Sequence, residues 1–258
     1  MGKTKQKKKQ DPFDSTMSLG DHLEELRMRL IRAILGLGLG AVICLFLCSK
    51  IITFIEGPYI GVMGEGARLQ TLAPADGIIS YIKIALISGL ILSSPWVFYQ
   101  LWMFVAAGLY PHEKRYVHMA VPFSAVLFVA GALFFILIVA PLTLRFLVKF
   151  NQRVLGVNSN FTFANYISFV TMLMLVFGIA FQTPIAIFFL NRTGLVSIQA
   201  LRRSRKFVLL CIFVVAAMAT PPDVISQVTL AIPLYGLFEL GILLSWFAER
   251  RKSPQNNQ

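Results

Sequence analysis

Long apolar runs separated by short charged segments constrain this chain more than any other feature. Each run extends for roughly 20 residues, the length that an α-helix needs to cross the hydrocarbon core of a bilayer. Apolar residues make up 57% of the sequence and charged residues only 14%, against about 25% charged residues in soluble domains. We therefore expect an all-α, polytopic membrane protein with no room for a large soluble domain.

Hydropathy predicts six transmembrane helices, and the fifth and sixth are expected to be short. The fifth would cover about 21 Å as a helix, less than a hydrocarbon core of about 30 Å, so a re-entrant hairpin is an alternative there. The predicted spans are 31–52, 78–98, 117–141, 166–190, 207–220 and 226–247. The predicted organisation is a disordered basic tail at 1–17, a membrane domain at 18–247 and a cytoplasmic tail at 248–258.

The positions of Lys and Arg predict how these spans are oriented, because basic residues accumulate in cytoplasmic loops. With the N-terminus inside, 18 of the 24 Lys and Arg residues fall on the inner side. If the fifth span did not cross, the three basic residues at 250–252 would move to the outer side. Six crossings with both termini in the cytoplasm therefore fit the charges best.

Several functional classes lack support in the sequence. The net charge of +12 does not indicate nucleic acid, because the basic residues flank the spans instead of forming a basic domain; anionic membrane lipids are the expected partner. No GxSxG, HExxH or GxxxxGK[ST] motif is present, and these motifs carry nucleophilic, zinc and phosphate chemistry. Cys44, Cys48 and Cys211 fall within predicted spans and are expected to pack as small apolar residues. We expect no enzymatic activity, no cofactor and no metal.

Acidic side chains on the otherwise basic inner side are the first candidate site. Asp21 and Glu25 lie four residues apart on an amphipathic helix expected from Ser18, and Glu113 precedes the third span. In the ordinary interpretation, Glu25 pairs with Arg29 and Glu113 interacts with a helix macrodipole. In the functional interpretation, the carboxylates form one patch that binds guanidinium groups through bidentate hydrogen bonds.

Polar residues in or beside the later spans form a second candidate set, consisting of Gln182, Asp223, Gln227 and Glu239. An ionisable residue within a bilayer usually faces a cavity or a partner, so Glu239 is a functional candidate, or a structural one if it lies near the cytoplasmic end. Asp223 fits equally well as the N-cap of the sixth span. Residues of this kind also suit the alternative function, a secondary transporter or channel for a small solute.

Five ordered motifs resemble TatC, the large subunit of the twin-arginine protein translocase. The resemblance covers roughly residues 18–247. The motifs are DHLEELRMRL at 21–30, SPWVFYQLWMF at 94–104, LYPHEKR at 109–115, FGIAFQTP at 177–184 and TPPDVISQVTLAIP at 220–233.

The resemblance implies a receptor that binds the paired arginines in signal peptides of folded exported proteins, with Glu25 and Glu113 as the binding carboxylates. Around them the expected binding set comprises Asp21, Leu26, Arg27 and Phe104. The resemblance also implies family roles for Pro58 and Asp223 on the outer side.

The family resemblance further implies an oligomeric complex with the single-span subunits TatA and TatB, transport driven by the protonmotive force, and a location in the bacterial plasma membrane. One position departs from the family pattern. Where the family usually has Glu in the fourth span, this sequence has Gln182, which forms hydrogen bonds but does not titrate. We therefore expect Gln182 to bond to another helix and not to relay protons.

Overall fold

The computed structural model describes residues 19–108, 114–157, 159–219 and 224–250. Within these ranges the chain is helical apart from short connections and one isolated β-bridge between Gln70 and Thr162, which confirms the predicted all-α class. The helical elements are α1 (Leu19–Met63), α2 (Asp76–Ala107), α3 (Lys114–Phe134), the π-helical η1 (Phe135–Val139), α4 (Ala140–Phe150), the π-helical η2 (Asn151–Leu155), α5 (Phe163–Ala180), α6 (Thr183–Arg192), α7 (Ile198–Arg203), α8 (Arg205–Ala219) and α9 (Val224–Arg250).

Five segments of the described chain are long and apolar enough to cross a membrane. These segments are Leu23–Met63, Asp76–Ala107, Val117–Leu155, Phe163–Arg192 and Ser226–Arg250, and they coincide with the first four predicted spans and the last. The predicted fifth span corresponds to α8, whose 15 residues cover about 22 Å. The polytopic membrane architecture is therefore confirmed, whereas the count of six crossings stays a prediction.

The last helix is longer than predicted. α9 contains 27 residues and covers about 40 Å, so the expectation of a short sixth span is corrected. Pro233 lies inside α9 without ending it. Proline is tolerated within membrane helices because neighbouring groups compensate for the missing backbone hydrogen bond.

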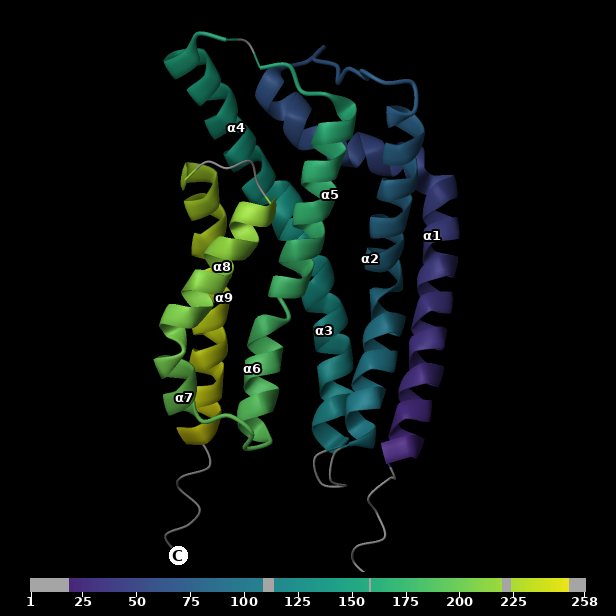
Figure 1. The fold of residues 1–258 in the computed structure, drawn as a ribbon, viewed down its shortest axis with the longest axis vertical. Helices are drawn as coiled ribbons and strands as arrows, with labels where there is room; N and C mark the ends of the chain where they lie inside the picture. Colours follow the sequence, from purple (N-terminus) through teal and green to yellow (C-terminus); the bar gives the residue numbers. More distant parts are fainter. Residues whose placement is uncertain (1–18, 109–113, 158, 220–223, 251–258) are drawn as a thin grey trace, which may run out of the picture.

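The main helices run up and down along the long axis of the molecule (Figure 1). α1 begins at the lower end of the view, α2 returns to it, and α9 also ends there. The last part of α1 turns across the upper end of the bundle. The first and last described helices thus begin and end at the same end of the bundle, the arrangement that an even number of crossings requires.

Two glycines bring α1 and α2 into close contact. A Cβ atom added at Gly89 would lie 2.5 Å from the amide nitrogen of Ala41, and one added at Gly40 would lie 2.6 Å from the carbonyl oxygen of Gly89. No side chain fits at such distances. Small residues that let helix backbones approach are a favoured means of association within membranes.

The main core lies where α5 packs against η1 and α1. Phe135 and Phe177 are fully buried, and their ring centroids are 5.4 Å apart. The buried Tyr166 donates a hydrogen bond of 2.7 Å to the carbonyl oxygen of Ile55. This bond ties α5 to α1 close to Pro58, where the proline ring removes one donor from the helix ladder.

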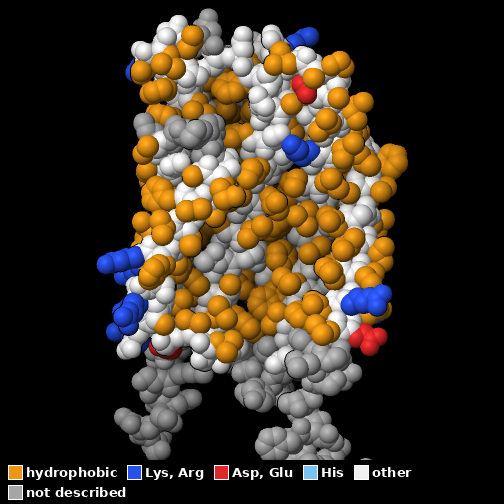
Figure 2. All heavy atoms as spheres, viewed as in Figure 1, with side chains coloured by type: hydrophobic (Ala, Val, Ile, Leu, Met, Phe, Trp, Pro, Cys, Tyr) orange, Lys and Arg blue, Asp and Glu red, His pale blue; other side chains and the backbone are white. Residues whose placement is uncertain are grey.

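The surface matches a bilayer environment. Figure 2 shows hydrophobic side chains over most of the visible face, with Lys and Arg side chains toward both its lower and its upper parts. Many large apolar residues are exposed, including Phe46 at 84% and Phe123 at 61%. Exposure on this scale would be costly in water and is favourable against lipid chains.

Candidate functional site

The first part of α1 carries the predicted amphipathic helix, which continues into the first span without a break. Its leucines stay on the surface: Leu23, Leu26 and Leu30 are 64%, 39% and 56% exposed. Their apolar face is therefore left largely uncovered by the described part of the chain. It is free to contact lipid or a partner protein.

Glu25 lies on this helix and forms a close ion pair. Its Oε1 atom accepts hydrogen bonds from Nε and NH2 of Arg29 at 2.9 and 2.7 Å. NH1 of Arg29 also donates to Oε1 of the buried Gln100 on α2, at 3.4 Å. The ordinary interpretation of Glu25 thus gains direct support, and the Arg29 side chain links α1 to α2.

The second carboxylate oxygen of Glu25, Oε2, takes no part in the bonds to Arg29. Oε2 is buried and has no hydrogen-bond partner among the described residues. A buried carboxylate oxygen without a donor is energetically costly, so this atom is well suited to accept a hydrogen bond from a ligand. A polar groove of about 880 Å³ is lined by Arg29, the ion-pair partner of Glu25, and by Arg32, Pro95, Trp96, Tyr99 and Gln100.

The remaining members of the predicted binding set are described only in part. Glu113 lies outside the described residues, and the side chain of Asp21 is not described. Arg27 is exposed on α1, and Phe104 is partly buried on α2. The structure therefore places Glu25 next to Arg29, which lines the polar groove, while the proximity of Glu25 to Glu113 stays a prediction.

Gln182 occupies a break between two helices. α5 ends at Ala180 and α6 begins at Thr183, so the predicted fourth span is two helices in sequence. The side-chain amide Nε2 of Gln182 donates to the carbonyl oxygen of Ser124 on α3 at 2.9 Å. Trp102 of α2 donates to the hydroxyl of the same serine at 2.8 Å. Gln182 thus joins a polar contact among three spans.

Glu239 lies on α9 opposite the first residue of α8. Its Oε2 atom accepts a 2.7 Å hydrogen bond from NH2 of Arg205, and its Oε1 atom accepts a 2.8 Å bond from the hydroxyl of Tyr235. Both carboxylate oxygens have partners within the chain, which favours the structural interpretation of Glu239. Gln227 is partly buried near the start of α9, and Asp223 lies outside the described residues.

Pro58 lies in the last turns of α1 and is partly buried. It lines a cavity of about 320 Å³ together with Ile136, Leu137 and Pro141. The side chain therefore faces the junction of η1 with α4 at the upper end of the bundle. The location of Pro58 on the outer side of the membrane stays a prediction.

Sequence analysis did not single out Gln100, Ser124 or Arg205 as site residues. Each one contacts a residue that it did single out: Arg29, Gln182 and Glu239, respectively. Gln100 and Ser124 are almost fully buried. A polar residue within an apolar run was the available signal, because buried polar groups require hydrogen-bond partners.

Comparison with known proteins gives consistent results. The model of the family described as Sec-independent protein translocase protein (TatC) matches residues 21–233. The chain is 39% identical over 239 residues to the TatC protein of Escherichia coli K12, covering 91% of this chain and 90% of the relative. It is 38% identical to the TatC protein of Aquifex aeolicus, covering 92% and 98% of the two chains.

The fold is also similar to a solved structure. The crystal structure described as the twin arginine translocase receptor TatC matches with a TM-score of 0.80 and 37% sequence identity, covering 88% of this chain and 99% of that chain. The matched family consists of translocase subunits and not of enzymes. Taken with the apolar helical bundle, these matches show that the chain belongs to the TatC family of Sec-independent protein translocase proteins, as a multi-pass membrane protein.

Proposed function

We propose that this chain is the signal-peptide receptor and core subunit of the twin-arginine translocase. It binds the paired arginines of signal peptides on folded cargo and, driven by the protonmotive force, takes part in their export. Its site lies at the end of the bundle where α1 begins, which we assign to the cytoplasmic face of the bacterial plasma membrane. Both termini are on that side, as the distribution of basic residues predicts.

The observation that carries this proposal is the buried Oε2 atom of Glu25, which has no hydrogen-bond partner within the described ranges. A guanidinium group that approaches through the polar groove gains a charge-assisted hydrogen bond there, while Arg29 keeps its bonds to Oε1. The planar fork of arginine suits a carboxylate in a way that the ammonium group of lysine does not. Glu113 provides the carboxylate for the second arginine in this proposal.

The translocase complex supplies the proposed partners. The single-span subunits TatA and TatB pack against lipid-facing helices of this chain. Gln182 serves as an interhelical hydrogen-bonding residue, since its amide already bonds to Ser124. The alternative of a small-solute transporter fits less well, because Gln182 and Glu239 are both engaged in bonds within the chain.

Binding of a synthetic twin-arginine signal peptide to the purified full-length chain tests the proposal. Glu25→Gln and Glu113→Gln should each weaken binding about tenfold or more, since hydrogen bonds to charged groups contribute about 1.5–3 kcal/mol. Replacing the peptide's two arginines by lysines should have a comparable effect. Glu24→Gln, which neutralises the exposed neighbour of Glu25, is the matched control and should leave the affinity unchanged.

Unchanged affinity in all three tests would remove the receptor function. Crosslinking offers a second measurement that does not depend on affinity. A photoreactive residue placed at position 25 or 113 should capture the arginine region of the peptide, and capture of only the distant carboxyl end of the peptide would contradict the assigned site.

A further inference from the structure

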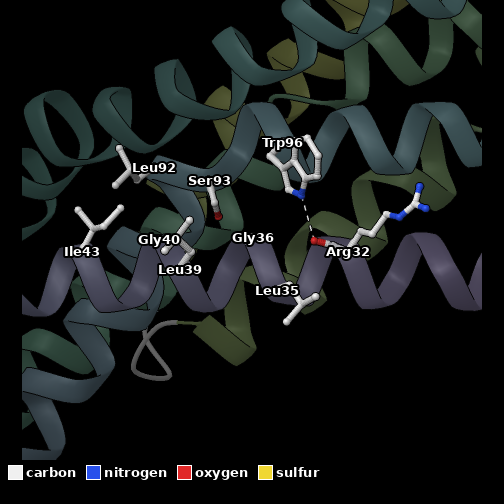
Figure 3. Close-up of a pocket in the computed structure, with 9 residues that line it drawn as sticks. All are labelled: Arg32, Leu35, Gly36, Leu39, Gly40, Ile43, Leu92, Ser93 and Trp96. Atoms are coloured by element: carbon white, nitrogen blue, oxygen red, sulfur yellow. Dashed lines mark hydrogen bonds between the residues drawn. The ribbon is translucent and has the colours of Figure 1, made fainter.

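An apolar groove runs along the surface of the bundle between α1 and α2, over residues 32–43 of α1 and 92–96 of α2 (Figure 3). It encloses about 560 Å³. Gly36 and Gly40 of α1 form its floor, and Leu39, Ile43 and Leu92 form its apolar sides. The groove opens outward, since Leu39 and Leu92 are 65% and 51% exposed.

Trp96 closes one end of this groove. A Cβ atom at Gly36 would lie 2.2 Å from Cδ1 of Trp96, so only glycine lets the indole ring rest on α1. The indole Nε1 donates a 2.9 Å hydrogen bond to the carbonyl oxygen of Arg32. The ring is thereby fixed at the junction between the apolar groove and the end of the bundle.

The lining determines what can occupy the groove. Apart from Arg32 and Ser93, its residues are apolar or glycine, and the Ser93 hydroxyl is directed to the carbonyl oxygen of Leu90 at 3.4 Å. Apolar cavities of this kind do not hold water well, and an empty groove loses dispersion contacts. In a bilayer, a lipid acyl chain is available to fill this groove.

A positive charge lies at the end of the groove that Trp96 closes. The guanidinium of Arg32 has no ion-pair partner among the described residues, unlike that of Arg29, which is paired with Glu25. Figure 3 shows the Arg32 side chain extending away from the apolar part of the groove. Arg32 and Trp96 also line the polar groove beside Glu25. An apolar groove thus continues into a polar, cationic one.

We propose that these two adjoining grooves bind one anionic glycerophospholipid, with an acyl chain against Gly36 and Gly40 and the phosphate beside Arg32. In such a lipid an apolar acyl chain is joined to a charged headgroup, and here an apolar groove is joined to a cationic one. Basic residues at the inner ends of membrane helices favour anionic headgroups. The site itself rests on the geometry of α1 and α2; only its assignment to the inner leaflet rests on the proposed function.

Photolabelling tests the site with the full-length chain in phosphatidylcholine vesicles. A trace of phosphatidylglycerol with a diazirine in its acyl chain should label residues 35–43 and 92–96. Arg32→Gln should reduce this labelling about fivefold, the equivalent of about 1 kcal/mol for one basic residue near an anionic lipid. Arg203→Gln, which removes an exposed arginine at the end of α7, should not reduce it.

Two further arms separate the headgroup from the chain. Diazirine-labelled phosphatidylcholine, whose phosphate charge is balanced by its choline cation, should label the same residues and respond less than phosphatidylglycerol to Arg32→Gln. Leu39→Trp, which fills the groove from an exposed position, should reduce labelling by both lipids in protein whose thermal midpoint is unchanged.

Several outcomes would overturn the lipid site. They are equal labelling by phosphatidylglycerol in wild type and Arg32→Gln, labelling spread evenly over the exposed apolar faces of the bundle, and displacement of the lipid by a signal peptide that crosslinks to position 39. Peptide affinity at Glu25 is measured separately, so failure of the lipid site leaves the receptor test intact.

Discussion

The polar side chains of the candidate residues differ in how completely their atoms are hydrogen-bonded. Glu239 and Gln182 have partners on neighbouring helices, and such bonds hold spans together where water is absent. Glu25 differs, because only one of its two carboxylate oxygens is bonded within the described chain. This oxygen on α1 therefore has the capacity to accept a hydrogen bond from a ligand.

The amide of Gln182 offers a test of the structural role. Gln182→Leu removes the donor to the Ser124 carbonyl oxygen and should lower the free energy of unfolding by about 0.5–1.5 kcal/mol. Heating the detergent-purified protein should show a thermal midpoint about 2–4 °C lower. Gln70→Leu, at an exposed position, controls for the added apolar surface. Equal midpoints for the two variants would show that the bond contributes nothing measurable.

Among the helices, α1 and α2 line both the polar groove and the apolar lipid groove. Their close approach depends on Gly40 and Gly89, and the same pair presents Glu25, Gln100 and the lipid groove. The geometry of both proposed sites therefore depends on a backbone contact that lies deeper in the bundle.

Glycine substitutions test this dependence. Gly89→Ala should destabilise the chain by about 1–3 kcal/mol, because the added methyl group forces the two backbones apart. Gly38→Ala is the matched control on α1: an added Cβ meets nothing within 4 Å, and alanine is the better helix former by about 1 kcal/mol. Yield of folded protein and thermal midpoint measure both. A neutral Gly89→Ala variant would mean that the helices separate freely.

For the molecule as a whole, the open question is how many times the chain crosses the bilayer. α8 has 15 residues, too few to cover a hydrocarbon core of about 30 Å without local thinning of the bilayer. α9 is long enough to cross alone. The two helices are joined near the start of α8 by the ion pair between Arg205 and Glu239.

Cysteine labelling in oriented vesicles tests the crossings. In a background without the three natural cysteines, Glu65→Cys, in the connection after α1, should react with an impermeant reagent only from outside. Ser197→Cys, before α7, should react only from inside. Val224→Cys, at the start of α9, should react from outside if α8 crosses. Its reaction from inside would support the re-entrant hairpin.

Much of the architecture was predictable from local pattern. The apolar runs identified the membrane helices because a bilayer leaves hydrogen-bonded helices as almost the only solution for such segments. Hydropathy did not predict the length of α9 or the break between α5 and α6 at Gln182. A proline can interrupt a membrane helix or be accommodated within it, and the neighbouring helices decide which occurs. The four-residue spacing of Glu25 and Arg29 was enough to predict that these two side chains pair. Nothing in the sequence indicated that Arg29 also bonds to Gln100.

Hydropathy and charge act locally along the chain, so the amino-acid sequence was enough to predict the helical membrane class, the family motifs and the end of the bundle at which Glu25 lies. The folded chain was needed to show which oxygen of Glu25 has no partner among the described residues, that Glu239 bonds to Arg205, and that α1 and α2 line a groove ending at Arg32. These features depend on contacts between residues far apart in sequence, and hydropathy carries no information about such contacts.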